Sequence, residues 1–181
     1  FRESGFDIRS KVTSGQVDVE LSLTLSTDGV TAVERRRRHA TVESLKPVFE
    51  PRGVAVIGAS RDGRKIGSRI LRALKSAPFH GDLYAVHPEA TDVQGVRTFR
   101  SARDLPDGVD LAVITIPAAA VLAAVDDCAA AGVRALVVIT AGFAEIGAEG
   151  RRAQDLLAEK VRGYGMRMIG PNCMGLINMA P

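Results

Sequence analysis

The stretch that decides the fold of this chain is Val54-Ala-Val-Ile-Gly58-Ala-Ser-Arg-Asp-Gly63-Arg-Lys-Ile-Gly67. It opens with a run of apolar residues, which is typical of a buried strand. The glycines predict a loop, and a helix is expected from about Ile66. A loop between a strand and a helix N-terminus directs backbone N–H groups and the positive end of the helix dipole to one spot. That spot suits a phosphate or pyrophosphate group.

The loop is longer than the G-x-G-x-x-G dinucleotide fingerprint, because its glycines fall at 58, 63 and 67. Taken alone, it predicts a phosphate-bearing cofactor, although glycines 58 and 67 would also relieve crowding between helix and strand. Ser60 is interpreted as a helix N-cap, a role compatible with phosphate contact. Arg61, Arg64 and Lys65 are interpreted equally well as phosphate contacts or as surface charges. We expect the backbone at Gly67 to approach the phosphate so closely that valine there would abolish binding and leave the fold intact.

Apolar runs alternate with helical stretches from residue 53 to the end of the chain. Strands separated by helices of about ten residues or more imply right-handed crossovers and a parallel sheet. We therefore predict an α/β fold with a Rossmann-like, doubly wound parallel sheet. The predicted strands are 54–58, 83–86, 111–116, 135–140 and 166–169, with a short one near 96–99, and the predicted helices are 66–77, 118–131 and 150–164.

The N-terminal part differs from this pattern. Residues 7–26 alternate apolar and polar side chains around Ser14-Gly15, which predicts a hairpin whose apolar face carries Val17, Val19, Leu21, Leu23 and Leu25. A lone hairpin is marginal in water, so we interpret it as the remnant of a larger sheet and the chain as a piece of a longer protein. The predicted organisation is a remnant at 1–30, a charged linker helix at 31–50 and a Rossmann-like domain at 51–181.

Ligands of parallel sheets bind at the carboxyl ends of the strands. Every predicted strand end after residue 53 carries small, turn-forming or hydrogen-bonding residues, as a long ligand lying across the sheet edge requires. These ends are Gly58-Ala59-Ser60, His87-Pro88, Ile116-Pro117, Thr140-Ala-Gly-Phe143 and Gly170-Pro-Asn172-Cys173.

The titratable residues form no catalytic constellation. His87 is expected to be a loop residue, and the three histidines lack metal-ligand spacing. Glu145 and Glu149 are interpreted as helix N-terminal charges. Cys173 has no identifiable base and is interpreted as structural. We predict a binding site with no catalytic residue and no metal.

Composition limits the partners. With 46% apolar and 25% charged residues, the chain has the composition of a soluble globular protein. Two isolated cysteines favour a reducing, cytoplasmic setting. The longest apolar stretch, 111–125, is broken by Pro117 and is too short to span a membrane. The arginines at 35–38 have no interleaved aromatic residues, so we predict a solvated helix face and no nucleic-acid partner.

Taken together, the strand ends form an ordered set: Gly-Ala-Ser-Arg, Val-His-Pro, Ile-Pro-Ala, Ile-Thr-Ala-Gly-Phe-Ala-Glu and Ile-Gly-Pro-Asn-Cys-Met-Gly. The set resembles the CoA-binding domain of the ADP-forming acyl-CoA synthetases, related to the α subunit of succinyl-CoA synthetase, and covers residues 45–181. The resemblance implies a CoA or acyl-CoA ligand, with its pyrophosphate on the loop and its thiol end near Asn172. The site residues that it implies are Gly58, Ala59, Ser60, Arg61, Lys65, Ile66, Gly67, Val86, His87, Pro88, Ile116, Pro117, Ile139, Thr140 and Asn172.

The chain departs from the family pattern at one position. Members of the family commonly carry a lysine just after the proline of the second strand end, where this chain has Glu89 after Pro88. A carboxylate cannot neutralise the adenosine 3′-phosphate, and Arg61, Arg64 or Lys65 are the candidates to compensate. The alternative is a domain that binds CoA weakly. The phosphorylated histidine of the synthetases belongs to a following domain, so residues 1–181 are not expected to make acyl-CoA alone.

A second resemblance concerns Phe1-Arg-Glu-Ser-Gly-Phe6 and the hairpin, which look like the C-terminal end of a GNAT-type acetyltransferase domain. It implies a parent that joins an acetyltransferase to a synthetase-like domain, as in some bacterial protein-lysine acetyltransferases. Our first hypothesis is therefore a module that binds or senses a small-molecule CoA thioester in such a fusion. The remaining domains of the parent chain, or a second copy of it, would be its protein partners.

Two alternatives stay open. One is an NAD(P)-binding Rossmann module of a redox sensor or dehydrogenase, which needs an acidic residue at the end of the second strand. Glu89 lies about 31 positions after Gly58, where roughly 20 is usual. The other alternative is the CoA half-site of an active ADP-forming acyl-CoA synthetase.

Overall fold

A computed structural model describes residues 8–13, 16–21, 27–89 and 91–176 of the chain. The chain divides into two compact units, Phe1–Leu45 and Lys46–Pro181. Among the described residues, no helix is both long enough and apolar enough to cross a membrane.

The first unit contains the predicted strand pair. Strands β1 (Ile8–Thr13) and β2 (Gln16–Leu21) are antiparallel, with Val12 opposite Val17. Leu23 and Leu25, which we expected on the same face, lie outside the described residues. Helix α1 (Thr27–Phe49) begins four residues before the predicted helix, and its arginines 35–38 are exposed, as predicted for a solvated face.

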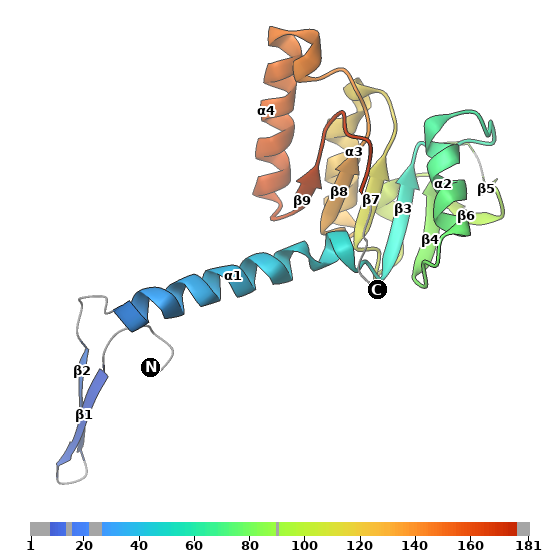
Figure 1. Cartoon of the computed structure of the whole chain (residues 1–181). Coiled ribbons are helices and arrows are strands. Elements are labelled where there is room, and N and C mark those ends of the chain that lie inside the picture. The colour runs from blue at the N-terminus through green and yellow to red at the C-terminus, as the bar shows by residue number, and fades with distance from the viewer. Residues whose placement is uncertain (1–7, 14–15, 22–26, 90, 177–181) are drawn as a thin grey trace. The chain divides into compact units, whose positions relative to one another are not determined.

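The second unit is built on a seven-stranded sheet in the order β5-β6-β4-β3-β7-β8-β9 (Figure 1). All neighbouring strands are parallel except β5 and β6, which pair antiparallel. This confirms the predicted α/β fold. The strands are β3 (Gly53–Ile57), β4 (Asp82–Val86), β5 (Asp92–Val93), β6 (Val96–Phe99), β7 (Leu111–Ile114), β8 (Ala135–Val138) and β9 (Arg167–Ile169).

Helices cover both faces of this sheet, so it is doubly wound as predicted. Figure 1 shows α2 in front of the sheet and α3 behind it. The helical elements of the unit, besides the last turn of α1, are α2 (Ile66–Ser76), α3 (Ala118–Ala130), α4 (Ala148–Gly163) and the short 3₁₀ turns η1 (Ala102–Asp104) and η2 (Ala144–Ile146).

The core lies on both faces because successive side chains of a strand point to opposite sides. On one face, Val54 and Val56 of β3 pack with Leu71 of α2 and Val48 of α1. On the other face, Ile57 belongs to the cluster that α3 and α4 cover. Burial on both faces explains why the strands appear in the sequence as continuous apolar runs.

A buried carboxylate joins three strands at the amino edge of the sheet. Asp110, which immediately precedes β7, is 2% exposed. Its carboxylate accepts hydrogen bonds from Arg52 Nε at 2.9 Å and from Arg134 Nη2 at 2.8 Å. These bonds, those from Arg52 first, hold the pKa of Asp110 far below its usual range. Arg52 leads into β3 and Arg134 into β8, so the carboxylate fixes the starts of both neighbours of β7.

Replacing this carboxylate should destabilise the fold. Asp110→Asn removes the negative charge that both guanidinium groups contact and is expected to lower the free energy of unfolding by about 2 kcal/mol. Urea unfolding at pH 7 measures the change, with the exposed Asp107→Asn as the matched control. Equal free energies of unfolding for Asp110→Asn and Asp107→Asn would contradict the stabilising role of the Asp110 carboxylate.

The same group predicts a pH dependence. The pKa of Asp110 is lower in the folded chain than in the unfolded chain, so its ion pairs stabilise the fold fully above the ordinary carboxyl pKa of about 4. Below that pH the unfolded chain takes up a proton that the folded chain does not, and the stabilisation falls. The stability difference between the parent chain and Asp110→Asn should therefore narrow by roughly 1 kcal/mol between pH 7 and pH 3.

Candidate functional site

The loop after β3 begins at a glycine that no other residue can replace without strain. Gly58 has a φ of +93°, a conformation that L side chains rarely adopt. A Cβ atom there would lie 2.8 Å from both Ile116 Cγ2 and Thr115 Oγ1. The backbone at Gly58 therefore packs directly against Thr115 and Ile116, which follow β7.

A serine that sequence reasoning missed holds this loop against α2. Ser68 is fully buried in the first turn of α2. Its hydroxyl donates to the Ser60 carbonyl at 2.6 Å and accepts from the Ser60 N–H at 3.0 Å. The sequence carries no local signal for this bridge, because it spans eight positions and depends on the path of the loop.

The prediction that Ser60 caps the helix is wrong. The Ser60 hydroxyl instead accepts a hydrogen bond from the Asp62 N–H at 3.2 Å, inside the loop. Lys65 occupies the N-cap position of α2 and makes no side-chain cap. Ser60 lies five positions before the N-cap residue Lys65, and its hydroxyl is already bound within the loop.

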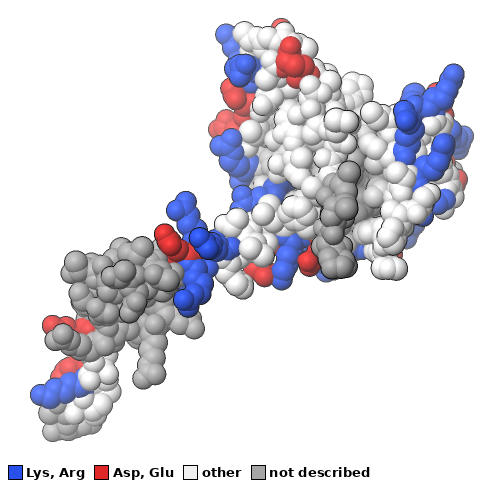
Figure 2. All heavy atoms as spheres, in the orientation of Figure 1, with Lys and Arg blue, Asp and Glu red and all other residues white. Residues whose placement is uncertain are grey.

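The N-terminus of α2 has the electrostatic character of an anion site. Its first turn contains no acidic residue and its cap has no side-chain acceptor. Arg61 and Lys65 are exposed beside it, and Figure 2 shows lysine and arginine side chains gathered over α2 and the elements next to it. Arg64 differs, because its Nε donates to Asp62 at 3.2 Å and its backbone and side-chain hydrogen bonds lower the pKa of that carboxyl.

The expectation that a valine at Gly67 would leave the fold intact is wrong. Gly67 is buried, and a Cβ atom there would lie 2.5 Å from Thr115 Oγ1 and 2.7 Å from the Gly58 carbonyl oxygen. Gly67 therefore lets α2 pack closely on the end of β3, and a valine there would disturb the fold and not binding alone.

Gly67→Ala should accordingly destabilise the chain. The added methyl group meets backbone atoms that cannot move without shifting α2, and overpacking of this kind costs about 1–3 kcal/mol. Gly163→Ala, at the end of α4 where a Cβ has open space, is the matched control and should be neutral or slightly stabilising. Thermal unfolding of both variants measures the difference, and equal melting temperatures would contradict this packing role.

Two hollows lie at the carboxyl edge of the sheet, and Ile116 lines both. The smaller one encloses about 260 Å³ on the β4 side of β3. Two of the polar side chains that line it are joined, because Ser101 Oγ donates to Asp127 at 2.9 Å. The full lining is Ile57, Gly58, Val86, Pro88, Arg100, Ser101, Ala102, Ile116, Ala120, Ala123, Ala124 and Asp127.

The larger hollow is an open groove of about 680 Å³ on the other side. The two threonine hydroxyl groups in its lining form hydrogen bonds to the backbone near the strand ends. Thr115 donates to the Ile57 carbonyl at 2.8 Å, and Thr140 donates to the Ile116 carbonyl at 2.7 Å. The Asn172 N–H donates to the Thr140 carbonyl at 3.0 Å. The groove is lined by Ile66, Ile70, Thr115, Ile116, Pro117, Ile139, Thr140, Ala141, Asn172, Cys173 and Met174.

Most of the predicted site residues therefore meet at one edge. Gly58, Val86, Pro88 and Ile116 line the smaller hollow. Ile66, Pro117, Ile139, Thr140 and Asn172 join Ile116 around the larger groove. Ala59, Ser60, Arg61, Lys65 and Gly67 form the loop and helix start between them, while His87 lines neither hollow.

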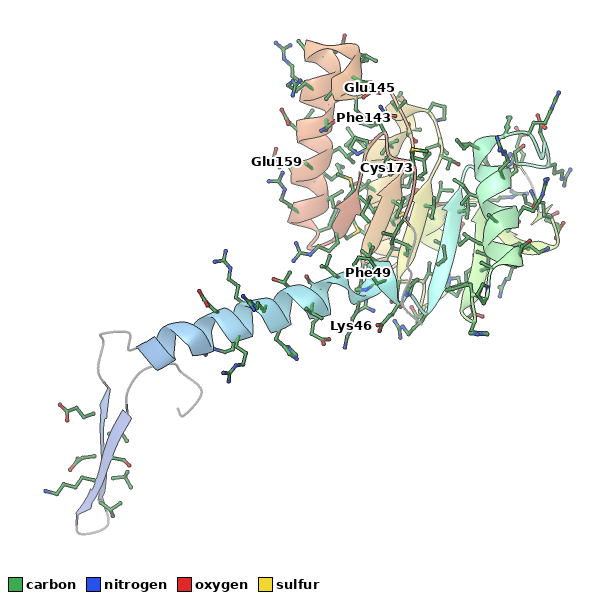
Figure 3. The ribbon with its side chains drawn as sticks, in the orientation of Figure 1. Lys46, Phe49, Phe143, Glu145, Glu159 and Cys173 are labelled. Atoms are coloured by element: carbon green, nitrogen blue, oxygen red, sulfur yellow. The ribbon has the colours of Figure 1, made fainter. Side chains whose placement is uncertain are left out.

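The other polar residues singled out in the sequence, His87, Glu145 and Glu149, lie in loops or at helix starts. His87 Nδ1 accepts a hydrogen bond from the Glu89 N–H at 3.1 Å, as expected of a loop residue. Glu149 lies in the first turn of α4 as predicted. Glu145 lies earlier, in η2, where the Gly142 N–H and then the Phe143 N–H bind its carboxylate and lower its pKa (Figure 3).

The two cysteines differ in surroundings. Burial raises the pKa of Cys128 to about 12. Cys173, labelled in Figure 3, is half-buried and its Sγ donates to the Val138 carbonyl at 3.4 Å. In the part of the chain that the structure describes, no group of three or more histidine, cysteine or acidic residues could hold a metal ion.

A doubly wound sheet with an uncapped helix N-terminus between two hollows defines a Rossmann-like domain for a phosphate-bearing cofactor. The family model for the CoA binding domain matches residues 52–179, and the chain belongs to this family. CoA is thus the cofactor that this family binds.

Two relatives of this chain are ADP-forming acetate–CoA ligases. The α subunit of ADP-forming acetate–CoA ligase II from Pyrococcus furiosus is 45% identical over 130 residues, 72% of this chain and 28% of the relative. ADP-forming acetate–CoA ligase I from Archaeoglobus fulgidus is 41% identical over 134 residues, 74% of this chain and 19% of the relative.

A solved structure shares the fold. The dinucleotide-forming acetyl-coenzyme A synthetase 1 of Ca. Korarchaeum cryptofilum, in complex with phosphate and ADP, matches with a TM-score of 0.70 and 44% identity over 72% of this chain and 28% of that chain. The chain thus spans less than a third of the length of these relatives. The domain is of the type found in ADP-forming acyl-CoA synthetases.

Proposed function

We propose that this chain provides the CoA half-site of an ADP-forming acyl-CoA synthetase. The observation that carries the proposal is the uncapped, acid-free N-terminus of α2, which lies between two hollows at the carboxyl edge. The relatives with 37–45% identity that are named as acetate–CoA ligases are ADP-forming enzymes, which supports synthesis over sensing.

The geometry suggests a path for the ligand. The pyrophosphate would lie at the start of α2, where the helix dipole and the exposed Arg61 and Lys65 favour anions. The adenosine would occupy the smaller hollow, because the ribose of a dinucleotide-type ligand lies at the end of the second strand of such a unit, here β4. The pantetheine arm would then follow the larger groove toward Asn172 and present its thiol there.

In this arrangement the described residues bind and orient CoA. The apolar walls of the groove exclude water from the pantetheine arm, and the thiol is left at the sheet edge for chemistry that other parts of a synthetase would supply. Activation of the acyl group and ADP formation therefore belong to the rest of the protein in this proposal.

The acetyltransferase fusion stays a prediction. The family model begins at residue 52, so it does not bear on the assignment of residues 1–30. If the full-length protein carries a phosphorylatable histidine in the domain after this one, synthesis is supported. Loss of that histidine would favour an acyl-CoA sensor.

The proposal predicts salt-sensitive CoA binding. Isothermal titration of the chain with CoA should give a one-to-one complex whose affinity falls as salt rises, since phosphate contacts are screened. NADH, titrated in parallel, should bind far more weakly. Tight NADH binding together with silence toward CoA would instead support the NAD(P) alternative.

Single cations of the loop should each contribute modestly. Lys65→Ala and Arg61→Ala are each expected to weaken CoA binding by about 1–2 kcal/mol, the range of one charge-assisted hydrogen bond. Arg152→Ala, an exposed arginine of α4, is the control and should leave affinity unchanged. Equal affinities across all three variants would place the pyrophosphate elsewhere.

A further inference from the structure

We infer that Arg100 binds the 3′-phosphate of CoA and makes this site select CoA over dephospho-CoA. The inference rests on the proposed function and deepens it. Arg100 follows β6 directly, is exposed, and lines the smaller hollow together with Val86 and Pro88.

The sheet register brings Arg100 to the strand end where the ribose belongs. β6 is parallel to β4, with Phe99 opposite Val86. The His87 N–H donates to the Phe99 carbonyl at 2.9 Å, which continues the pairing one residue beyond the strand. Arg100 therefore lies beside His87 and Pro88, on the strand next to the one whose end faces the ribose.

The hollow itself has the character of a nucleoside pocket. Its walls are apolar, formed by Ile57, Val86, Ile116 and the alanines of η1 and α3, and suit a flat base. Its polar groups gather at Arg100, Ser101 and Asp127. A base packed against the apolar walls places its ribose, and hence the 3′-phosphate, toward the β4 end and Arg100.

Arg100 has a positive charge that other groups do not use. Within the described part of the chain it forms no ion pair. The neighbouring cations are engaged: Arg103 Nε contacts Asp127 at 3.1 Å, and the Arg97 guanidinium lies 4.9 Å from the centre of the Phe99 ring. Asp127 is in turn satisfied by Arg103 and Ser101.

The chemistry fits a phosphate monoester. A guanidinium group can donate two parallel hydrogen bonds to phosphate oxygens. The exposed Glu89, at the end of β4, cannot serve this role because it is an anion. Arg100, directly after β6, supplies the positive charge that is missing at the end of β4.

Dephospho-CoA, which lacks only the 3′-phosphate, is the probe that isolates this contact. The parent chain should bind CoA about tenfold more tightly than dephospho-CoA in isothermal titration. Arg100→Ala should lower CoA affinity about tenfold and leave dephospho-CoA affinity unchanged, which removes the preference. Arg100→Lys should retain part of it, and Arg152→Ala should retain all of it.

The outcomes separate this inference from the proposed function. If the parent chain binds both ligands and Arg100→Ala weakens both equally or neither, Arg100 does not contact the 3′-phosphate while the CoA site stands. If the parent chain binds neither ligand, the proposed function fails and the inference fails with it. Thermal unfolding of Arg100→Ala should match the parent, because the side chain is exposed; a CoA-specific loss in a normally melting variant supports the inference.

Discussion

The close contact of α2 with the end of β3 is the constraint on which the rest of the site depends. Gly67 lets the helix approach to a distance that a side chain would fill, and Gly58 lets the chain turn beneath Thr115. Ser68 then fastens the loop with two hydrogen bonds to one residue, Ser60. The start of α2 has no side-chain cap, and the proposed function places the pyrophosphate there.

Different interactions shape the two edges of the sheet. At the amino edge, a buried Asp110 joins the starts of three strands through two arginines. At the carboxyl edge, the hydroxyl groups of Thr115 and Thr140 donate hydrogen bonds to the backbone carbonyls of Ile57 and Ile116, where the strands end. The ion pairs and the hollows therefore lie at opposite edges of the sheet.

Two hollows of different size lie at the carboxyl edge of the sheet. Apolar residues line the smaller hollow together with Arg100, which forms no ion pair within the described part of the chain; in the proposed arrangement this hollow would hold the nucleoside. The larger groove includes Asn172 and Cys173 in its lining, and in the proposed arrangement it would hold the pantetheine arm. The matched region makes up 28% of the Pyrococcus furiosus relative and of the Ca. Korarchaeum cryptofilum structure, so most of each relative lies outside the part that this chain resembles.

The sequence by itself determined where the main strands and helices lie along the chain, since the runs that form β3, β7 and β8 are buried throughout and turn residues follow them. It also determined the loop at Gly58 and the set of motifs that resemble the CoA domain. Tertiary structure alone decided what each residue of the loop does. Ser60 is no cap, Gly67 faces β3, and Ser68 and Asp110 carry contacts across eight and 58 positions. Such roles depend on which distant backbone lies nearby, and a local pattern contains no information on that distance.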